Sequence, residues 1–154
     1  MIVNKKGNIL DAEENLICHQ VNCRGVMGAG LAKQVTHKYP KVFTSYRHLI
    51  NSVYGSSSMF LGDVQYVNVG EDKYVCNLFG QNYYGNNPLV QYTDYGALRN
   101  CLIKVRGVAI KHNYSMALPY MIGCGKGNGK WDEVLEIIES IFKDDVVKVS
   151  IYRL

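Results

Sequence analysis

Residues 16–32 read LICHQVNCRGVMGAGLA, and this stretch decides the fold. Its first six residues form a short apolar run of the length of a buried strand. Three glycines follow, and from Gly28 to about Lys38 the apolar positions Leu31 and Val35 recur at helical spacing. A strand that passes through a glycine-rich turn into a helix is typical of an α/β domain.

The segments on either side continue this alternation. We expect further strands at residues 1–4, 61–69, 74–79, 115–118 and 146–152, and helices at 42–50, 94–106 and 131–142. Pro40 should break or bend the first helix, and Gly70 to Lys73 should form a hairpin turn. The pattern predicts helices on both faces of a mostly parallel sheet, with ligands bound beyond the carboxyl ends of its strands.

Length and composition indicate one globular domain over residues 1–154. Of these residues 47% are hydrophobic and 19% are charged, and the net charge is +4. This mild basic excess suits an anionic ligand and does not predict stable binding to duplex nucleic acid. No apolar run is long enough to cross a membrane, and the five cysteines show no disulfide spacing, so we expect a cytoplasmic monomer.

A second glycine loop reads IGCGKGNG at residues 122–129, again between an expected strand and an expected helix. Alternate glycines can present successive backbone N–H groups as a nest for an anion. Two such loops favour a ligand with more than one phosphate, or a diphosphate beside a sugar, although glycines also serve simple tight turns. Neither loop matches a P-loop or a G-x-G-x-x-G dinucleotide fingerprint.

Several separated motifs, in the same order along almost the whole chain, resemble those of the macro domain family. They are Gly7-Asn8-Ile9, His19-Gln20-Val21-Asn22, Met27-Gly28-Ala29-Gly30-Leu31-Ala32, Ile122-Gly123-Cys124-Gly125, Trp131 and the C-terminal residues 149–154. The similarity is greatest to the branch that holds terminal ADP-ribose protein glycohydrolase, the DNA-ADP-ribose-removing antitoxins and the yeast-type ADP-ribose-1''-phosphate phosphatase. It implies a three-layer α/β/α fold with a mixed, mostly parallel sheet of about six strands, and a cleft for ADP-ribose.

The resemblance also implies a set of ligand-binding residues. Asn8 and Ile9 would bind adenine and Tyr152 would pack on it, Asn22 and residues 28–30 would lie at the distal ribose, and residues 123–126 would surround the diphosphate. For Asn8 a turn or capping role remains an alternative. The complete expected set is Asn8, Ile9, Val21, Asn22, Met27, Gly28, Ala29, Gly30, Gly123, Cys124, Gly125, Lys126, Gly127, Asn128 and Tyr152.

The residues expected to perform catalysis depart from part of the family pattern. Glycohydrolase and antitoxin members use a lysine where this chain has Gln81, and the human-type enzyme uses an aspartate where it has Gly127. Glutamine cannot act as an amine nucleophile. The phosphatase-like pattern H-x-x-N-C is present from His19 to Cys23, so His19 is a candidate for proton transfer, with a structural histidine as the alternative.

Asn22 and Arg24 complete the catalytic candidates, Asn22 by fixing the distal ribose and Arg24 by stabilising a phosphate or a developing anion. Cys124, between two glycines, is a possible nucleophile, but small side chains also commonly occupy tight phosphate loops for steric reasons. The cysteine and histidine residues lack zinc-ligand spacing, so we expect no metal and no cofactor.

Three functional hypotheses follow. The first is a hydrolase that removes ADP-ribose from protein or nucleic acid, or dephosphorylates ADP-ribose-1''-phosphate. The second is a reader module that binds ADP-ribose without turning it over. The third is a general nucleotide-binding α/β domain.

Overall fold

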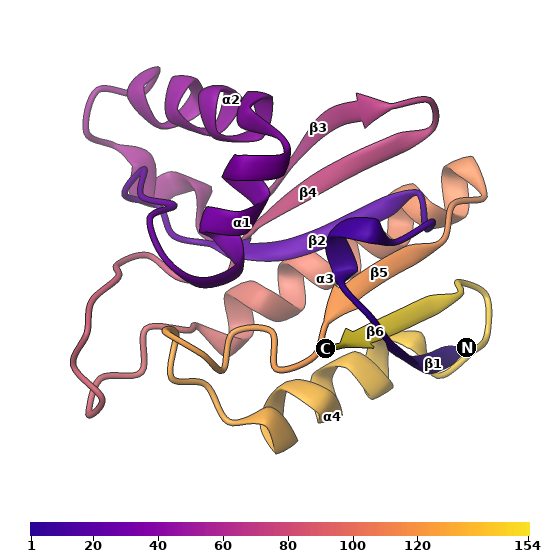
Figure 1. Ribbon diagram of the computed structural model, residues 1–154. Coiled ribbons are helices and arrows are strands. Elements are labelled where there is room, and N and C mark those ends of the chain that lie inside the picture. Colours follow the sequence, from indigo (N-terminus) through magenta and orange to yellow (C-terminus); the bar gives the residue numbers. More distant parts are fainter.

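A mixed β-sheet lies between two layers of helices in the computed structural model, which describes all 154 residues. Helices α1 (Gly30–Lys38) and α2 (Pro40–Asn51) cover one face (Figure 1). Helices α3 (Tyr95–His112) and α4 (Trp131–Phe142) cover the other (Figure 1). The expected three-layer α/β/α fold is therefore confirmed.

The sheet has six strands in the order β1-β6-β5-β2-β4-β3. Only β3 and β4 pair antiparallel, and all other neighbours are parallel. The strands are β1 (Ile2–Lys6), β2 (Leu16–Val21), β3 (Val64–Gly70), β4 (Lys73–Phe79), β5 (Met116–Pro119) and β6 (Val149–Arg153). Two short 3₁₀ helices, η1 (Ile9–Asp11) and η2 (Ser57–Phe60), complete the secondary structure.

Separate apolar clusters fill the two spaces between sheet and helices. The larger, of 19 buried residues, joins the sheet to α3 and α4, and the smaller, of 11, joins it to α1 and α2. Because side chains alternate along a strand, Cys18 of β2 faces α3 while Val21 faces α1. The same alternation turns His19 toward the α1 side.

The main differences from the expected bounds have local causes. Helix α1 starts at Gly30, whose φ of +57° turns the chain into the helix, and not at Gly28. Strand β3 starts at Val64 because Gly62, with a φ of +88°, ends the preceding turn. Helix α3 continues to His112, where Asn113 adopts the left-handed conformation that stops a helix.

The parallel register brings the carboxyl ends of β2, β5 and β6 to one edge of the sheet. Both glycine loops leave the sheet at this edge, one after β2 and one after β5. No helix has both the length and the apolar character that a membrane span needs.

Candidate functional site

Three adjoining cavities form a cleft along this edge of the sheet. The tyrosine cavity, of about 320 Å³, is lined by residues that include Asn8 and Tyr152. The central cavity, of about 220 Å³, lies between the two glycine loops, and the asparagine cavity, of about 140 Å³, includes Asn22. Leu31 is shared by the first two cavities and Gln81 by the last two, so the three form a continuous row.

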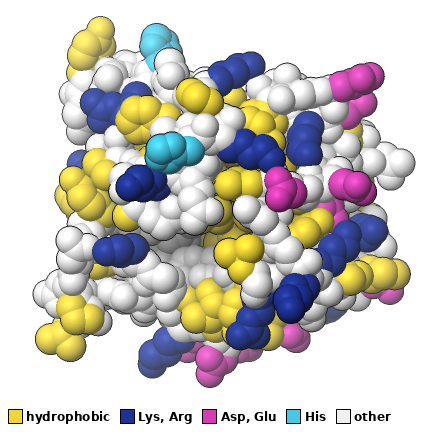
Figure 2. Space-filling model, in the orientation of Figure 1, with side chains coloured by type: hydrophobic (Ala, Val, Ile, Leu, Met, Phe, Trp, Pro, Cys, Tyr) yellow, Lys and Arg dark blue, Asp and Glu magenta, His cyan; other side chains and the backbone are white.

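Figure 2 shows this face hollowed between α1 and the second glycine loop. White atoms, which include the backbone, line much of the hollow, and the acidic side chains of this face gather on the right and along the lower edge of the view. A hollow whose acidic groups lie at a distance suits an anionic ligand.

The first glycine loop brings unused backbone donors to the central cavity. Ala29 has an extended backbone, with a φ of −143°, and forms the N-cap of α1. The N–H groups of residues 28–32 donate to no protein acceptor, and Ala29 to Ala32 line the central cavity. Free N–H groups at a helix start carry the positive end of its dipole.

The second glycine loop supplies matching donors from the opposite side. The N–H groups of Gly123, Gly125, Lys126 and Gly127 have no protein acceptor, and all four residues line the central cavity. The N–H groups of Cys124 and Gly129 are used inside the loop, on Met121 and Gly123. Two sets of free donors therefore border one cavity, an arrangement that fits phosphate oxygens.

Steric exclusion fixes the path of the second loop. A Cβ at Gly127 would lie 2.2 Å from Thr93 Oγ1 and 2.7 Å from the carbonyl oxygen of Gly123. A Cβ at Gly129 would also lie 2.7 Å from that oxygen, whereas one at Gly125 would meet nothing within 4 Å. The glycines at 127 and 129 are thus required by close backbone packing, and the one at 125 is not.

Asn22 organises the first loop as well as lining the asparagine cavity. Its Oδ1 accepts hydrogen bonds from the N–H groups of Arg24 (2.9 Å) and Val26 (3.4 Å), and the Tyr46 hydroxyl, which donates to the Asn22 backbone carbonyl at 2.6 Å, lies 2.9 Å from Oδ1. Its Nδ2 donates to the Val26 carbonyl at 2.8 Å. The NH₂ group of Asn22 has two N–H bonds, and only one of them donates to Val26. The second is left for a ligand.

Asn8 and Tyr152 lie together at the tyrosine end, as predicted. Asn8 Oδ1 accepts from the Leu10 N–H at 3.0 Å and caps η1, so the capping role is observed in a residue that also lines the cavity. The Tyr152 hydroxyl donates to Glu14 Oε1 at 2.5 Å, and Lys5 Nζ lies 2.8 Å from Glu14 Oε2. This clasp of Lys5, Glu14 and Tyr152 fixes the aromatic wall of the cavity.

The clasp depends on a buried charge. The Glu14 side chain is only 4% exposed. Burial alone would raise its pKa, but the hydrogen bonds from Lys5 and Tyr152 lower the pKa of Glu14 to about 2. The carboxylate therefore stays ionised at neutral pH.

His19 lines the central cavity but is 2% exposed. Its Nε2 lies 2.5 Å from Asn77 Oδ1, and its Nδ1 is buried without a partner. Burial lowers the pKa of His19 to about 4, although the bond to Asn77 acts in the opposite direction. The ring is therefore neutral at pH 7 and presents to its surroundings an acceptor rather than an acid.

A polar network beneath the cleft includes residues that the sequence analysis did not select. Gln20 Nε2 donates to Gln81 Oε1 and to Thr93 Oγ1, both at 2.8 Å, and the Thr93 hydroxyl donates to the Gly123 carbonyl at 2.6 Å. The network ties β2 and residues 81–93 to the second loop. Only the position of Gln20 at the carboxyl end of a strand could have indicated it from sequence.

Most of the predicted binding residues come together in the cleft. Ile9 lines the tyrosine cavity, Gly30 the central cavity, and Val21, Met27 and Gly28 the asparagine cavity. Lys126 borders two of the cavities, and its Nζ donates to Asn86 Oδ1 at 2.9 Å.

Three predicted residues do not line any of the three cavities. Arg24 bonds to Ser58 and Asn82, and its guanidinium lies 4.5 Å from the Tyr83 ring centroid, outside the cleft. The Cys124 side chain turns to the α3–α4 core, and burial raises the pKa of its thiol to about 11. Asn128 Nδ2 instead donates to the Asn87 and Val90 carbonyls.

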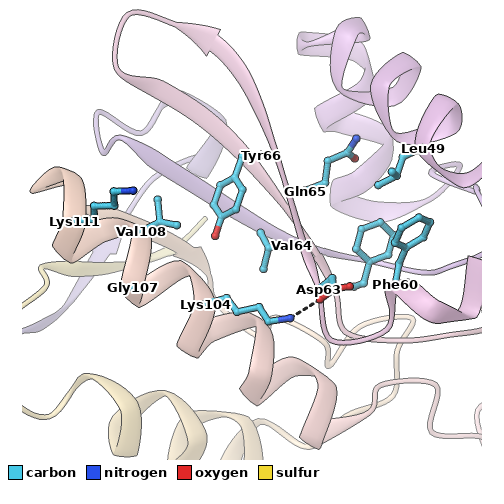
Figure 3. Close-up of a pocket in the computed structure, with 11 residues that line it drawn as sticks. Leu49, Phe60, Asp63, Val64, Gln65, Tyr66, Lys104, Gly107, Val108 and Lys111 are labelled. Atoms are coloured by element: carbon cyan, nitrogen blue, oxygen red, sulfur yellow. Dashed lines mark hydrogen bonds and ion pairs between the residues drawn. The ribbon is translucent and has the colours of Figure 1, made fainter. Parts of the chain in front are cut away.

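A further cavity, of about 630 Å³, lies outside the cleft. This rear groove runs between α3 and the edge strand β3 (Figure 3). Its lining is mainly apolar, with an ion pair between Lys104 and Asp63 (Figure 3). It contains none of the predicted site residues, and no group of three or more metal-ligating side chains occurs anywhere in the chain.

Comparison with known proteins gives a consistent assignment. The Macro domain family model matches residues 18–138. A DNA ADP-ribosyl glycohydrolase of Mycobacterium tuberculosis is 27% identical over 146 residues, which are 93% of this chain and 39% of that protein. A 17.5 kDa protein of Enterobacteria phage T4 is 30% identical over 143 residues, 88% of this chain and 86% of that one.

Solved structures share the fold. The macrodomain of Mycobacterium tuberculosis DarG superposes with a TM-score of 0.83 and 26% identity, covering 100% of this chain and 98% of that one. A Bacteroides thetaiotaomicron protein superposes with a TM-score of 0.87 and 31% identity over 100% of both chains. The order of the strands, the two glycine loops and the family match together show that this chain belongs to the macro domain family.

Proposed function

We propose that the cleft binds ADP-ribose. The observation that carries the proposal is the central cavity, where free N–H groups from both glycine loops converge on the space that a diphosphate would fill. Adenine would lie against Tyr152 in the tyrosine cavity, and the distal ribose would lie beside Asn22. The order of the cavities matches the order of the parts in the ligand.

We further propose that the protein hydrolyses an ADP-ribosyl derivative. The substrate would be ADP-ribose linked to protein or nucleic acid, or ADP-ribose-1''-phosphate. Support comes from the name of the mycobacterial relative, whose length this chain matches only in part. In each glycosidic case, water adds to the anomeric carbon and the attached group leaves with a proton; in the phosphate case, water displaces the phosphate.

The polar groups that line the central and asparagine cavities define how such a reaction would proceed. Gln81 stands where related enzymes carry a lysine, and both ends of its amide are engaged, with Gln20 and with the Tyr83 carbonyl. An amine nucleophile is therefore absent at position 81. His19, neutral and partly unpaired, is the residue best suited to accept a proton or a hydrogen bond from water.

Lys126 supplies the positive charge at the same end of the cleft. It borders the central and asparagine cavities, where it can neutralise the diphosphate while Asn86 holds its amine. Catalysis would rest mainly on positioning by the loops. Arg24, bonded outside the cleft, has no part in this scheme.

The alternative is a reader module that binds ADP-ribose and does not cleave it. It is favoured by Gln81 and by Gly127, where a carboxylate side chain would collide with Thr93. Both functions need the same binding cleft, and they differ only in turnover.

Calorimetry with ADP-ribose, AMP, ATP and NAD tests the binding proposal. We expect ADP-ribose to bind most tightly, because it alone fills all three cavities without excess. Equal affinity for the four compounds, or no binding of ADP-ribose, would contradict the assignment and favour a general nucleotide-binding domain.

Incubation with ADP-ribosylated protein, ADP-ribosylated DNA and ADP-ribose-1''-phosphate then separates hydrolase from reader. Turnover of any one above the uncatalysed rate supports the hydrolase and identifies the linkage. The reader stands if ADP-ribose binds and none of the three is consumed. In a hydrolase, His19→Ala should reduce kcat far more than it reduces affinity for ADP-ribose, and an equal loss in both would make His19 structural.

A further inference from the structure

Three polar side chains cross the sheet beneath α1 and α2, on a face that is otherwise apolar. In the strand register His19 of β2 lies opposite Asn77 of β4, and Asn77 lies opposite Gln65 of β3. Asn77 is fully buried and His19 nearly so. Polar groups at such depth are costly unless they are hydrogen-bonded, so their pairing needs an explanation.

The side chains form a ladder of hydrogen bonds that ends on a backbone carbonyl. Gln65 Nε2 donates to the Ser45 carbonyl of α2 at 3.0 Å, and Asn77 Nδ2 donates to Gln65 Oε1 at 3.0 Å. His19 Nε2 then lies 2.5 Å from Asn77 Oδ1. We call this set, from the Ser45 carbonyl to His19, the polar ladder.

The carbonyl end fixes the direction of every bond. A carbonyl oxygen only accepts, so Gln65 must turn its NH₂ group to Ser45 and its oxygen to Asn77. Asn77 must then turn its NH₂ group to Gln65 and its oxygen to His19. An oxygen facing the ring requires the proton on Nε2, which leaves Nδ1 as an unprotonated acceptor.

The two ends of the ladder lie in different environments. His19 is one of the residues that line the central cavity, and its Nδ1 is a buried atom without a protein partner at that end of the ladder. Gln65 is half-buried and borders the rear groove at the edge strand β3, where Figure 3 shows its side chain on the other side of the strand from Val64 and Tyr66, toward Leu49 of α2. A change at Gln65 therefore alters the ladder without touching the cleft.

We propose that Gln65 and Asn77 are positioning residues that hold His19 in the Nε2–H form, so that its Nδ1 accepts a hydrogen bond from an O–H group in the cleft. The inference rests on the proposed function. The donor is a ribose hydroxyl of the ligand or the water that attacks it. Phosphate oxygens are repelled by the same lone pair, which leaves them to the backbone N–H groups.

The test measures the ring tautomer directly, by nitrogen-15 NMR of histidine side chains in the full chain at pH 7. His19→Gln assigns the His19 signals among the four histidines. The wild type should show a protonated Nε2 and an unprotonated Nδ1. A wild-type ring protonated on Nδ1 would overturn the inference.

Gln65→Leu should remove the acceptor that orients Asn77 and let its amide turn, so that the His19 proton redistributes between the two nitrogens. Gln65→Glu is the control, because its carboxylate loses the bond to the Ser45 carbonyl but still accepts from Asn77 Nδ2, and it should therefore keep the wild-type tautomer. Far-UV circular dichroism confirms that both variants fold. An unchanged tautomer in Gln65→Leu would overturn the positioning role.

The functional arm identifies the donor. In Gln65→Leu we expect a loss of at least about tenfold, either in kcat with unchanged ADP-ribose affinity, if the donor is water, or in affinity, if it is a ribose hydroxyl. A tautomer change with neither loss would overturn the inference. Failure of the wild type to bind ADP-ribose would instead remove the proposed function, and the inference with it.

Discussion

The two glycine loops present the same chemistry to the cleft and are held in place by opposite means. In the first loop, the conformation depends on one side chain, since Asn22 Oδ1 accepts hydrogen bonds from two N–H groups of the loop, those of Arg24 and Val26. In the second, it depends on the absence of side chains, since Gly127 and Gly129 pack against Thr93 and the Gly123 carbonyl. Similar anion-binding loops can thus be held in shape either by hydrogen bonds from a side chain or by close packing that leaves no room for one.

The difference has a practical meaning for mutation. Removing the asparagine leaves two N–H groups of the loop without their acceptor and should weaken both the fold and the site. Adding a methyl group to the second loop displaces free N–H groups at the surface and should weaken mainly the site. The following predictions separate these two kinds of damage.

The largest effect is expected from Gly127→Ala. Its Cβ would lie 2.2 Å from Thr93 Oγ1 and 2.7 Å from a carbonyl oxygen, so the loop must move and misplace its donors. Loss of about 3 kcal/mol of charge-assisted hydrogen bonding lowers ADP-ribose affinity on the order of 100-fold. Calorimetry measures the affinity of Gly127→Ala for ADP-ribose. Gly125→Ala is the control, because a Cβ at residue 125 meets nothing within 4 Å. Equal affinities of the two variants would refute steric control.

Asn22→Ala should lower the free energy of unfolding by about 2 kcal/mol, because the Arg24 and Val26 N–H groups lose their acceptor, while the Tyr46 hydroxyl keeps its bond to the backbone carbonyl of residue 22. Urea denaturation measures this change. Tyr46→Phe is the comparison, because it leaves Asn22 Oδ1 bonded to both N–H groups and instead removes the hydroxyl that donates to the Asn22 carbonyl. An Asn22→Ala protein of wild-type stability would show that the loop holds itself.

Lys126→Met tests the contact between the second loop and residues 80–92. The substitution removes the bond to Asn86 and a positive charge beside the central cavity. Because this amine is exposed and screened by salt, the expected loss of ADP-ribose affinity is only about fivefold, and it should shrink as ionic strength rises. A loss that does not depend on salt would indicate a structural role.

The clasp at the tyrosine end differs from both loops because a charge holds it. The pKa of Glu14 is about 2 in the folded protein, below its ordinary value of 4.5, so the folded state binds fewer protons between these values. Stability from Glu14 is therefore present above pH 4.5 and is lost as the pH falls toward 2. Glu14→Gln should flatten this part of the curve of unfolding free energy against pH. An unchanged slope would exclude the clasp as its source.

Local patterns predicted the elements well. Strand β2 was predicted at its observed bounds, because a short apolar run between polar turn residues is typical of a buried strand. The cleft residues of both loops were also predicted, since glycines at strand-to-helix junctions point to a ligand beyond the strand ends.

The interactions between distant segments could not be read from the sequence. Neither the register that places Asn77 beside His19 nor the meeting of Gln20 with Thr93 leaves a local pattern. The direction of the Cys124 side chain and the engagement of Arg24 by Ser58 likewise depend on tertiary packing. Side-chain roles in the cleft were thus harder to predict than the cleft itself.

The crowding at position 127 restricts the evolutionary routes open to this protein. An acidic residue there would need a smaller residue at 93 first, and that change would remove the hydroxyl that binds Gln20 and Gly123. The Gly123 carbonyl would still obstruct the new side chain. A carboxylate at position 127 would therefore require a change that reroutes the loop, and a point substitution there would not supply it.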